Sequence, residues 1–178
     1  MKALIFGLIL ACVSTQAMAQ AVKGAKDVIP GRLIRAGTTN QAPYSDDTLR
    51  DLCEKGYTLA IYVYAGGRNT DVTCSKGTIS YRNITSWQNP DKTLPLIGQA
   101  LSKGGKVVVH CWNGVHASNY VTALSLNKFC GFNGPQTATA WRNGFNGGIP
   151  QSTINKLSGQ LSSLSGGGSV MEGCPTPR

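Results

Sequence analysis

A short segment around one cysteine is the part of the sequence best suited to chemistry. It follows the apolar residues 107–109 and reads His110-Cys111-Trp112-Asn113-Gly114-Val115-His116-Ala117-Ser118. A turn between a strand and a helix lets successive backbone N–H groups converge on an anion at the helix N-terminus. The same N–H groups favour the thiolate form of a central cysteine, which is its nucleophilic form. Residues 110–118, the Cys111 loop, are therefore predicted to bind an anion beside a nucleophile.

Strand and helix patterns alternate around this loop. Strands are predicted at residues 33–35, 57–64, 78–84 and 106–110, of which the second and fourth are apolar enough to be buried. Helices are predicted at residues 45–55, 89–103, 117–129 and 135–142, and a last one carries the apolar stripe Ile154, Leu157, Leu161 and Leu164. This order predicts a three-layer α/β fold with a mostly parallel central sheet flanked by helices. Ligands bind beyond the carboxyl ends of such strands, which is where Cys111 lies.

The Cys111 loop resembles the signature of the cysteine-dependent protein tyrosine and dual-specificity phosphatases. That signature is His-Cys, five residues, Arg, and then Ser or Thr, between a buried strand and a helix. His110, Cys111, Gly114 and Ser118 match it in place, whereas Ala117 occupies the position of the Arg. The resemblance implies a phosphatase-like fold and attack by Cys111 on phosphorus to give a phosphocysteine intermediate.

The resemblance also assigns roles within the loop. His110 is expected to help hold the thiolate, and Ser118 to assist its release. Phosphate is expected to bind along the residues between them, namely Trp112, Asn113, Gly114, Val115, His116 and Ala117. No cofactor is expected, and no metal site is predicted, because two histidines on one tight turn lack the spacing and the further ligands that a metal ion needs.

The missing Arg puts turnover in doubt. A planar guanidinium would hold two phosphoryl oxygens and neutralise charge in the transition state, and Ala117 does neither. Loss of one preorganised donor costs roughly 10²- to 10³-fold in rate, and a bidentate charged donor should cost at least as much. His116 would be a weak substitute at mildly acid pH. Arg35 and Arg142 are the other candidates to replace the guanidinium.

A phosphatase also needs a general acid to protonate the leaving oxygen. The family supplies an Asp upstream of the signature, sometimes as Trp-Pro-Asp. The candidate here is Asp91, at the end of the stretched version Trp87-Gln88-Asn89-Pro90-Asp91. Helix capping explains the same residues, with Asn89 as the cap, Pro90 in the first position and Asp91 in the first turn. Both interpretations stay open at the level of sequence.

The N-terminus predicts export. An apolar run at residues 3–13 is followed by the small-residue pattern Ala17-Met18-Ala19. We therefore expect a signal peptide at residues 1–19, a single phosphatase-like α/β domain at residues 20–164 and a flexible Gly- and Pro-rich tail at residues 165–178, unless Cys174 fastens that tail. The mature protein is expected in the periplasm or outside the cell.

The cysteines predict two disulfides and one free thiol. Once Cys12 leaves with the signal peptide, an odd number of cysteines remains in a compartment that favours disulfides. Cys111 is the one with a chemical reason to stay free. The expected pairs are Cys53 with Cys74 and Cys130 with Cys174. A lipoprotein would instead keep Cys12 as its modified residue, but the apolar region before Cys12 is short.

The charge balance favours anionic partners. The chain carries 17 Lys and Arg against 8 Asp and Glu, for a net charge of +9 at pH 7. The basic residues are scattered singly, without the clusters or interleaved aromatic residues of a nucleic-acid groove. We expect a phosphorylated or acidic ligand, no nucleic acid and no stable membrane insertion. The sequence predicts no particular oligomeric state.

Three functions fit these features. The favoured one is an exported pseudophosphatase, which binds phosphate or another anion and has impaired or lost hydrolysis. The alternative is an active thiol-dependent phosphomonoesterase that acts through a phosphocysteine intermediate. In the third, Cys111 is bridged in a disulfide, which would exclude nucleophilic chemistry and leave the fold as a surface for assembly.

Overall fold

A mixed sheet forms the centre of the computed structural model, which describes residues 22–145, 147–168 and 170–177. The order of its strands is β1-β2-β6-β3-β5-β4. Pairing is parallel between β2 and β6, β6 and β3, and β3 and β5, and antiparallel at the two edges. The strands are β1 (Val22–Ile29), β2 (Leu33–Thr38), β3 (Tyr57–Tyr62), β4 (Thr70–Cys74), β5 (Gly77–Asn83) and β6 (Lys106–His110).

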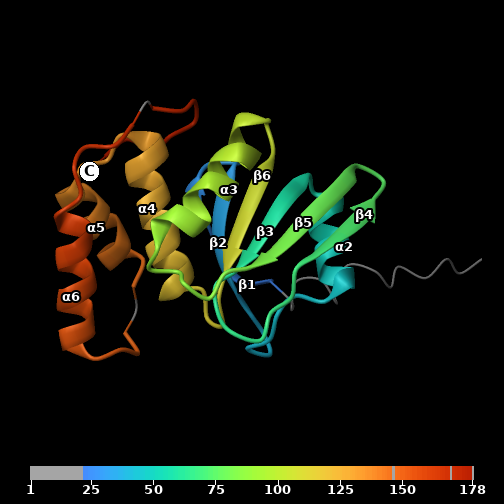
Figure 1. Cartoon of the computed structure of the whole chain (residues 1–178), viewed down its shortest axis with the longest axis horizontal. Helices are drawn as coiled ribbons and strands as arrows, with labels where there is room; N and C mark the ends of the chain where they lie inside the picture. Colours follow the sequence, from blue (N-terminus) through green and yellow to red (C-terminus); the bar gives the residue numbers. More distant parts are fainter. Residues whose placement is uncertain (1–21, 146, 169, 178) are drawn as a thin grey trace, which may run out of the picture.

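Helices cover both faces of the sheet, which confirms the predicted α/β layers (Figure 1). Helix α2 packs on one face, and α3 and α4 pack on the other. Helices α5 and α6 pack outside α4 and add a further apolar cluster there. The helices are α2 (Asp46–Glu54), α3 (Pro90–Ser102), α4 (Ala117–Cys130), α5 (Gly134–Asn143) and α6 (Gln151–Ser162).

Local capping sets the ends of the helices, as the sequence predicts. The side chain of Ser45 accepts a hydrogen bond from the Thr48 N–H at 3.2 Å and begins α2. Asn89 caps α3, and Gly131 ends α4 in the left-handed conformation at φ 70°. Helix α4, like α6, has no side-chain cap at its start: its N-cap residue, His116, makes no side-chain capping bond. Its first backbone N–H groups therefore lack a side-chain cap.

The edge strands β1 and β4 were not predicted from the sequence. Most of β1 is exposed, with only its last residue, Ile29, buried. In β4 only Val72 is buried. Edge strands that turn polar side chains to solvent on both faces lack the apolar pattern by which a strand is identified, so tertiary pairing decides their conformation.

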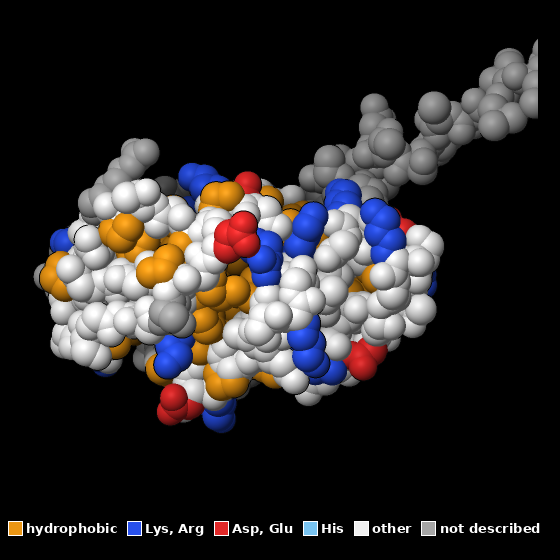
Figure 2. Space-filling model, turned by 90° about the horizontal axis from the view of Figure 1, so that it is seen from above, with side chains coloured by type: hydrophobic (Ala, Val, Ile, Leu, Met, Phe, Trp, Pro, Cys, Tyr) orange, Lys and Arg blue, Asp and Glu red, His pale blue; other side chains and the backbone are white. Residues whose placement is uncertain are grey.

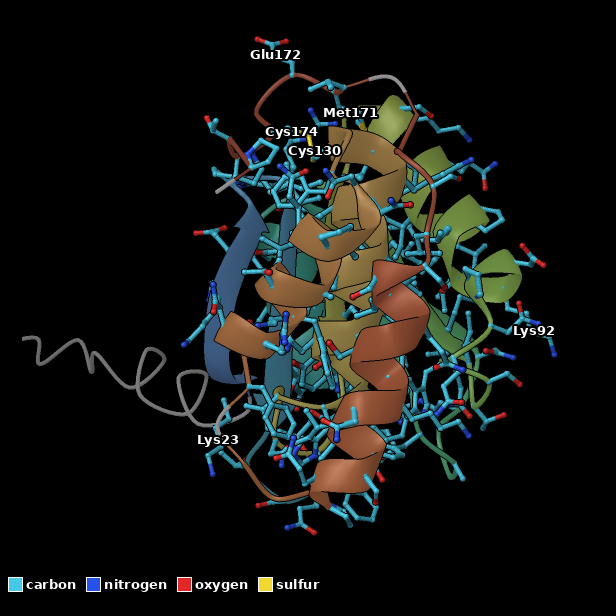
Figure 3. The ribbon with its side chains drawn as sticks, turned by 90° about the vertical axis from the view of Figure 1, so that its left-hand side faces the viewer. Lys23, Lys92, Cys130, Met171, Glu172 and Cys174 are labelled. Atoms are coloured by element: carbon cyan, nitrogen blue, oxygen red, sulfur yellow. A yellow bond between two sulfur atoms is a disulfide. The ribbon has the colours of Figure 1, made fainter. Side chains whose placement is uncertain are left out.

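Two disulfides confirm the expected pairing. Cys53 is bonded to Cys74, which joins α2 to β4, and Cys111 is a free thiol. The second bridge joins Cys130 at the end of α4 to Cys174 in the tail (Figure 3). Beside it, the Met171 N–H donates to the Phe129 carbonyl at 2.9 Å. The C-terminal segment is thus fastened to α4 at this end.

Two features bear on the cellular compartment. The disulfides fit an oxidising environment outside the cytosol. Within the described ranges, no helix combines the length and apolar character needed to cross a membrane. The predicted signal peptide at residues 1–19 lies outside the described residues.

Candidate active site

The Cys111 loop leaves the carboxyl end of β6 and is held by the neighbouring strand β2. The Cys111 N–H donates to the Ala36 carbonyl at 3.2 Å, and the Thr38 N–H donates to the Trp112 carbonyl at 2.9 Å. These two bonds extend the pairing of β2 with β6 into the loop. The loop therefore starts from a fixed position on the sheet.

Two glycines let the loop lie directly on the end of β2. A Cβ on Gly37 would lie 2.6 Å from the carbonyl carbon of Asn113. A Cβ on Gly114 would lie 2.7 Å from the carbonyl carbon of Ala36, and Gly114 has φ +76°. Because real Cβ atoms do not approach backbone this closely, both positions require glycine. Contact between the two backbones sets the depth of the loop.

The thiol of Cys111 lies inside the turn, with backbone and hydroxyl groups around it. The Gly114 N–H donates to Cys111 Sγ at 3.2 Å, and Ser118 Oγ lies 3.2 Å from the same sulfur. Cys111 is fully buried, with 0% of its surface exposed. The sulfur thus lies at the N-terminus of α4, where uncapped amides and the helix dipole favour negative charge.

The side chain of Asn113 folds into the same turn. Its Oδ1 accepts a hydrogen bond from the Val115 N–H at 3.4 Å and lies 3.8 Å from Cys111 Sγ. An amide oxygen here uses an N–H group that an anion in the loop would need. The Asn113 side chain therefore uses a backbone N–H group of the loop to which it belongs.

The ring of His110 lies on the opposite face of the sheet from the Cys111 sulfur, because successive residues of a strand point to opposite faces. It stacks on Tyr44 with ring centroids 3.7 Å apart, and its Nε2 lies 2.9 Å from the Tyr81 hydroxyl. Its Nδ1 has no hydrogen-bond partner among the described residues. Burial lowers the pKa of His110 to about 3, so the ring is neutral at physiological pH.

Ala117 is fully buried at the position of the signature Arg. The structure brings Arg35 to the loop, where its guanidinium donates to the carbonyls of Gly114 and Gly144. Arg142 instead is exposed in the last turn of α5. His116 is engaged elsewhere, because its Nε2 lies 2.8 Å from the Gly147 carbonyl oxygen.

Aromatic side chains lie at the rim of the loop, and sequence analysis did not identify them as a group. Trp112 is 44% exposed, and its indole N–H donates to the Tyr62 hydroxyl at 2.7 Å. The rings of Tyr64 and Trp112 are 5.1 Å apart. The available signal was that Tyr62 ends β3 and Tyr64 follows it closely, and parallel neighbours such as β3 and β6 end at the same edge of the sheet.

Asp91, the predicted general acid, lies at the start of α3. Its N–H is capped by the Asn89 side chain at 3.0 Å. Asp91 lines a groove with Leu124 and Lys128, in the second half of α4, whereas Cys111 lies at the N-terminus of that helix. Across the described residues, no group of three or more His, Cys, Asp and Glu side chains could hold a metal ion.

The burial of His110 makes stability depend on pH. Its pKa is about 3 when folded and near 6.5 when unfolded, so unfolding takes up a proton between these values. The contribution of His110 to the free energy of unfolding is fully present above about pH 6.5 and decreases as the pH is lowered toward 3. We expect a loss of about 2 kcal/mol between pH 7 and pH 5, measured by urea unfolding. This loss should be absent in His110→Phe and present in His116→Asn; an unchanged dependence in His110→Phe would contradict the assignment.

Gly37→Ala should dismantle the loop, because the added Cβ would overlap the Asn113 backbone. We expect a destabilisation of about 1 to 3 kcal/mol in chemical unfolding and faster alkylation of Cys111. Gly159→Ala is the matched control, since its Cβ meets nothing within 4 Å and Ala favours the helix. Equal stabilities of the two variants would show that the glycine contact is not required.

Asn113→Ala should open the centre of the loop. Without the amide oxygen, the Val115 N–H becomes available and the Cys111 sulfur is less covered. We expect iodoacetamide to label Cys111 several-fold faster, with stronger protection by vanadate than in the unsubstituted protein. Asn155→Ala, on the exposed side of α6, is the control. Unchanged labelling would mean that Asn113 does not limit access to the sulfur.

No protein-family model matches the chain, and a search of curated proteins found no similar sequence. Solved structures do match. The human tyrosine phosphatase-like serine/threonine/tyrosine-interacting protein aligns with a TM-score of 0.52 at 16% identity, over 76% of this chain and 94% of that one. Tk-PTP in its active form aligns with a TM-score of 0.52 at 18% identity, over 78% of this chain and 95% of that one. A mouse candidate dual-specificity phosphatase complexed with zinc tungstate aligns with a TM-score of 0.53 at 13% identity, over 85% of this chain and 92% of that one. The chain therefore has the fold of the cysteine-dependent tyrosine and dual-specificity phosphatases, as the Cys111 loop predicted.

Proposed function

We propose that this protein is an exported phosphate- or anion-binding pseudophosphatase with impaired or lost hydrolysis. One observation carries the proposal: the loop is assembled around the free thiol of Cys111, while a buried Ala117 stands where the signature has its Arg. The loop geometry supports anion binding, and the substitution removes the group that makes such a loop an efficient catalyst.

Backbone groups supply the binding. The N–H of Gly114 points at the Cys111 sulfur, and the Val115 N–H is held only by the long bond to Asn113. The overall charge favours the same ligands. On the face seen in Figure 2, Lys and Arg side chains lie among uncharged and acidic ones. The ligand proposed is phosphate itself, or a phosphorylated or acidic molecule that presents such a group.

Two further features argue against efficient turnover. The Cys111 sulfur is fully buried, and the Asn113 amide oxygen accepts the bond from the Val115 N–H that an incoming phosphoryl group would use. The acid candidate Asp91 lies beside the second half of α4. Proton transfer requires hydrogen-bond reach of the leaving oxygen, directly or through one water. Attack and protonation would thus both be slow.

The alternative, an active phosphomonoesterase, is favoured by one contact. Ser118 Oγ lies 3.2 Å from Cys111 Sγ, where it can stabilise the thiolate as a leaving group. In this reaction the thiolate forms an S–P bond while the ester P–O bond breaks and the alcohol leaves with a proton. Water then attacks phosphorus and the S–P bond breaks. Phosphate is released and the thiolate is regenerated.

The first test measures binding and turnover on the same oxidised protein. We expect phosphate, vanadate or tungstate at about ten times its Kd to stabilise the fold by roughly 1.4 kcal/mol, a rise in Tm of a few degrees, relative to NaCl of equal ionic strength. Hydrolysis of p-nitrophenyl phosphate is expected at the level of Cys111→Ser.

Each other outcome is informative. Turnover that Cys111→Ser abolishes would select the phosphomonoesterase and overturn the pseudophosphatase. Absence of stabilisation by all three anions would overturn anion binding. Gly37→Ala, whose loop is disturbed, should lose the stabilisation and shows whether the anion binds at the Cys111 loop or elsewhere on the basic surface.

A further inference from the structure

Arg35 is a buried arginine in the middle of β2. Its side chain is on the same face of the sheet as Val109, its register partner on β6, and as the Cys111 sulfur. Only 5% of Arg35 is exposed. A guanidinium keeps its charge in nearly every protein environment, so the fold holds a positive charge directly behind the Cys111 loop.

The guanidinium joins two segments that are far apart in sequence. Its Nη1 donates to the Gly114 carbonyl in the loop, and its Nη2 donates to the Gly144 carbonyl after α5 at 3.0 Å. The C=O and N–H of one trans peptide point in opposite directions. Holding the Gly114 carbonyl from behind therefore turns the Val115 N–H toward the centre of the loop.

The charge of Arg35 lacks a carboxylate partner. The ion pairs found among the described residues are Arg50 with Asp47, Arg68 with Asp46 and Arg82 with Asp71. Asp27 lines the same small pocket as Arg35 but is not within ion-pair distance. A buried charge is costly unless something of opposite charge lies near it.

Cys111 is the neighbour that can carry the opposite charge. Burial lowers the pKa of Arg35, and a charge on Cys111 acts in the opposite direction. The other ionisable groups whose pKa responds to a charge on Cys111 are tyrosines: Tyr44 before α2 and Tyr62 on β3, which pack on the opposite face of the sheet, and Tyr64 after β3. Burial, and to a smaller degree the charge of Cys111, raises the pKa of Tyr44 and Tyr64, and burial likewise raises that of Tyr62. They stay neutral at physiological pH, as does His110.

We infer that Arg35 is a positioning residue that supplies, from behind the loop, the positive charge that the signature Arg would supply from within it. Its counter-charge is the Cys111 thiolate or an anion bound above that sulfur. This inference rests on the proposed anion-binding function and gives it a physical basis, because a charge near the loop favours anions even with Ala117 in place.

The position of Arg35 also separates binding from catalysis. Each of its terminal nitrogens donates to one backbone carbonyl, that of Gly114 or that of Gly144, so the guanidinium is directed at backbone oxygens instead of presenting its paired N–H groups to two phosphoryl oxygens. A fixed charge behind the loop favours an anion in the ground state and in the transition state alike. Uniform stabilisation of this kind strengthens binding without raising kcat.

The test compares Arg35→Met, Arg35→Lys and Arg142→Met in the full oxidised chain. Met removes the charge at similar length, and Lys keeps the charge but loses the fork. Arg142, exposed in the last turn of α5, is the matched control. Circular dichroism and Tm report folding, titration with tungstate reports anion affinity, and iodoacetamide labelling from pH 5 to 9 reports the pH profile of Cys111.

In Arg35→Met we expect iodoacetamide labelling of Cys111 at neutral pH to slow several-fold and tungstate affinity to fall at least tenfold, while Arg142→Met stays unchanged. Arg35→Lys should remain within about threefold of the original affinity, since the charge persists. A folded Arg35→Met with an unchanged profile would overturn the inference. If Arg35→Met does not fold, Arg35→Lys decides: loss of affinity as complete as in Gly37→Ala would overturn it.

The two proposals fail in different ways. If the unsubstituted protein binds no tungstate, the proposed function fails, and the labelling profile of Arg35→Met still tests whether Arg35 acts on Cys111. If tungstate binds and Arg35→Met changes neither affinity nor profile, the function stands and the role of Arg35 is refuted.

Discussion

The candidate site depends on one contact between two stretches of backbone. The end of β2 lies against the Cys111 loop, and Gly37 and Gly114 meet without side chains between them. This contact sets the height of the loop above the sheet, and so the position of Cys111 Sγ relative to the first turn of α4. Arg35 lies two residues before Gly37 on the same strand. The contact therefore also places the Arg35 guanidinium within hydrogen-bonding distance of the Gly114 carbonyl. Loop, thiol and charge are thus positioned together.

The alternation of side chains along β6 divides the site between two faces of the sheet. His110 points into a layer of tyrosines and is neutral there, whereas Cys111 points into the layer that holds Arg35 and the start of α4. The polar environment of the thiol therefore consists of backbone N–H groups, the Ser118 hydroxyl, the Asn113 side-chain amide and the Arg35 guanidinium. That combination is suited to holding negative charge, and it lacks a group free to follow the charge as it moves during phosphoryl transfer.

The sequence predicted the parallel centre of the fold and the location of the site, because both follow from local patterns. Residues 106–110 form an apolar strand before a cysteine and a helix, and such an order leaves few arrangements. The edge strands β1 and β4 were not predicted, because their extended conformation depends on pairing with a neighbouring strand and not on a pattern of buried residues. The contacts of Arg35 and Asn113 could not be predicted for a different reason, although the sequence already made Arg35 a candidate to replace the missing guanidinium and Asn113 a member of the loop. Arg35 is 79 positions away from its partner Gly114, and the inward turn of the Asn113 side chain is decided only once the loop is packed.

The complete burial of Cys111 has a consequence in the oxidising environment that the two disulfides fit. A reactive thiol exposed in such a place would be converted to sulfenic acid or captured in a mixed disulfide. With 0% of its surface accessible in the folded, doubly bridged protein, Cys111 is shielded from both fates. The burial that slows the approach of a substrate thus also protects the thiol from oxidation. At this sulfur, resistance to oxidation and fast reaction with a substrate make opposite demands on exposure.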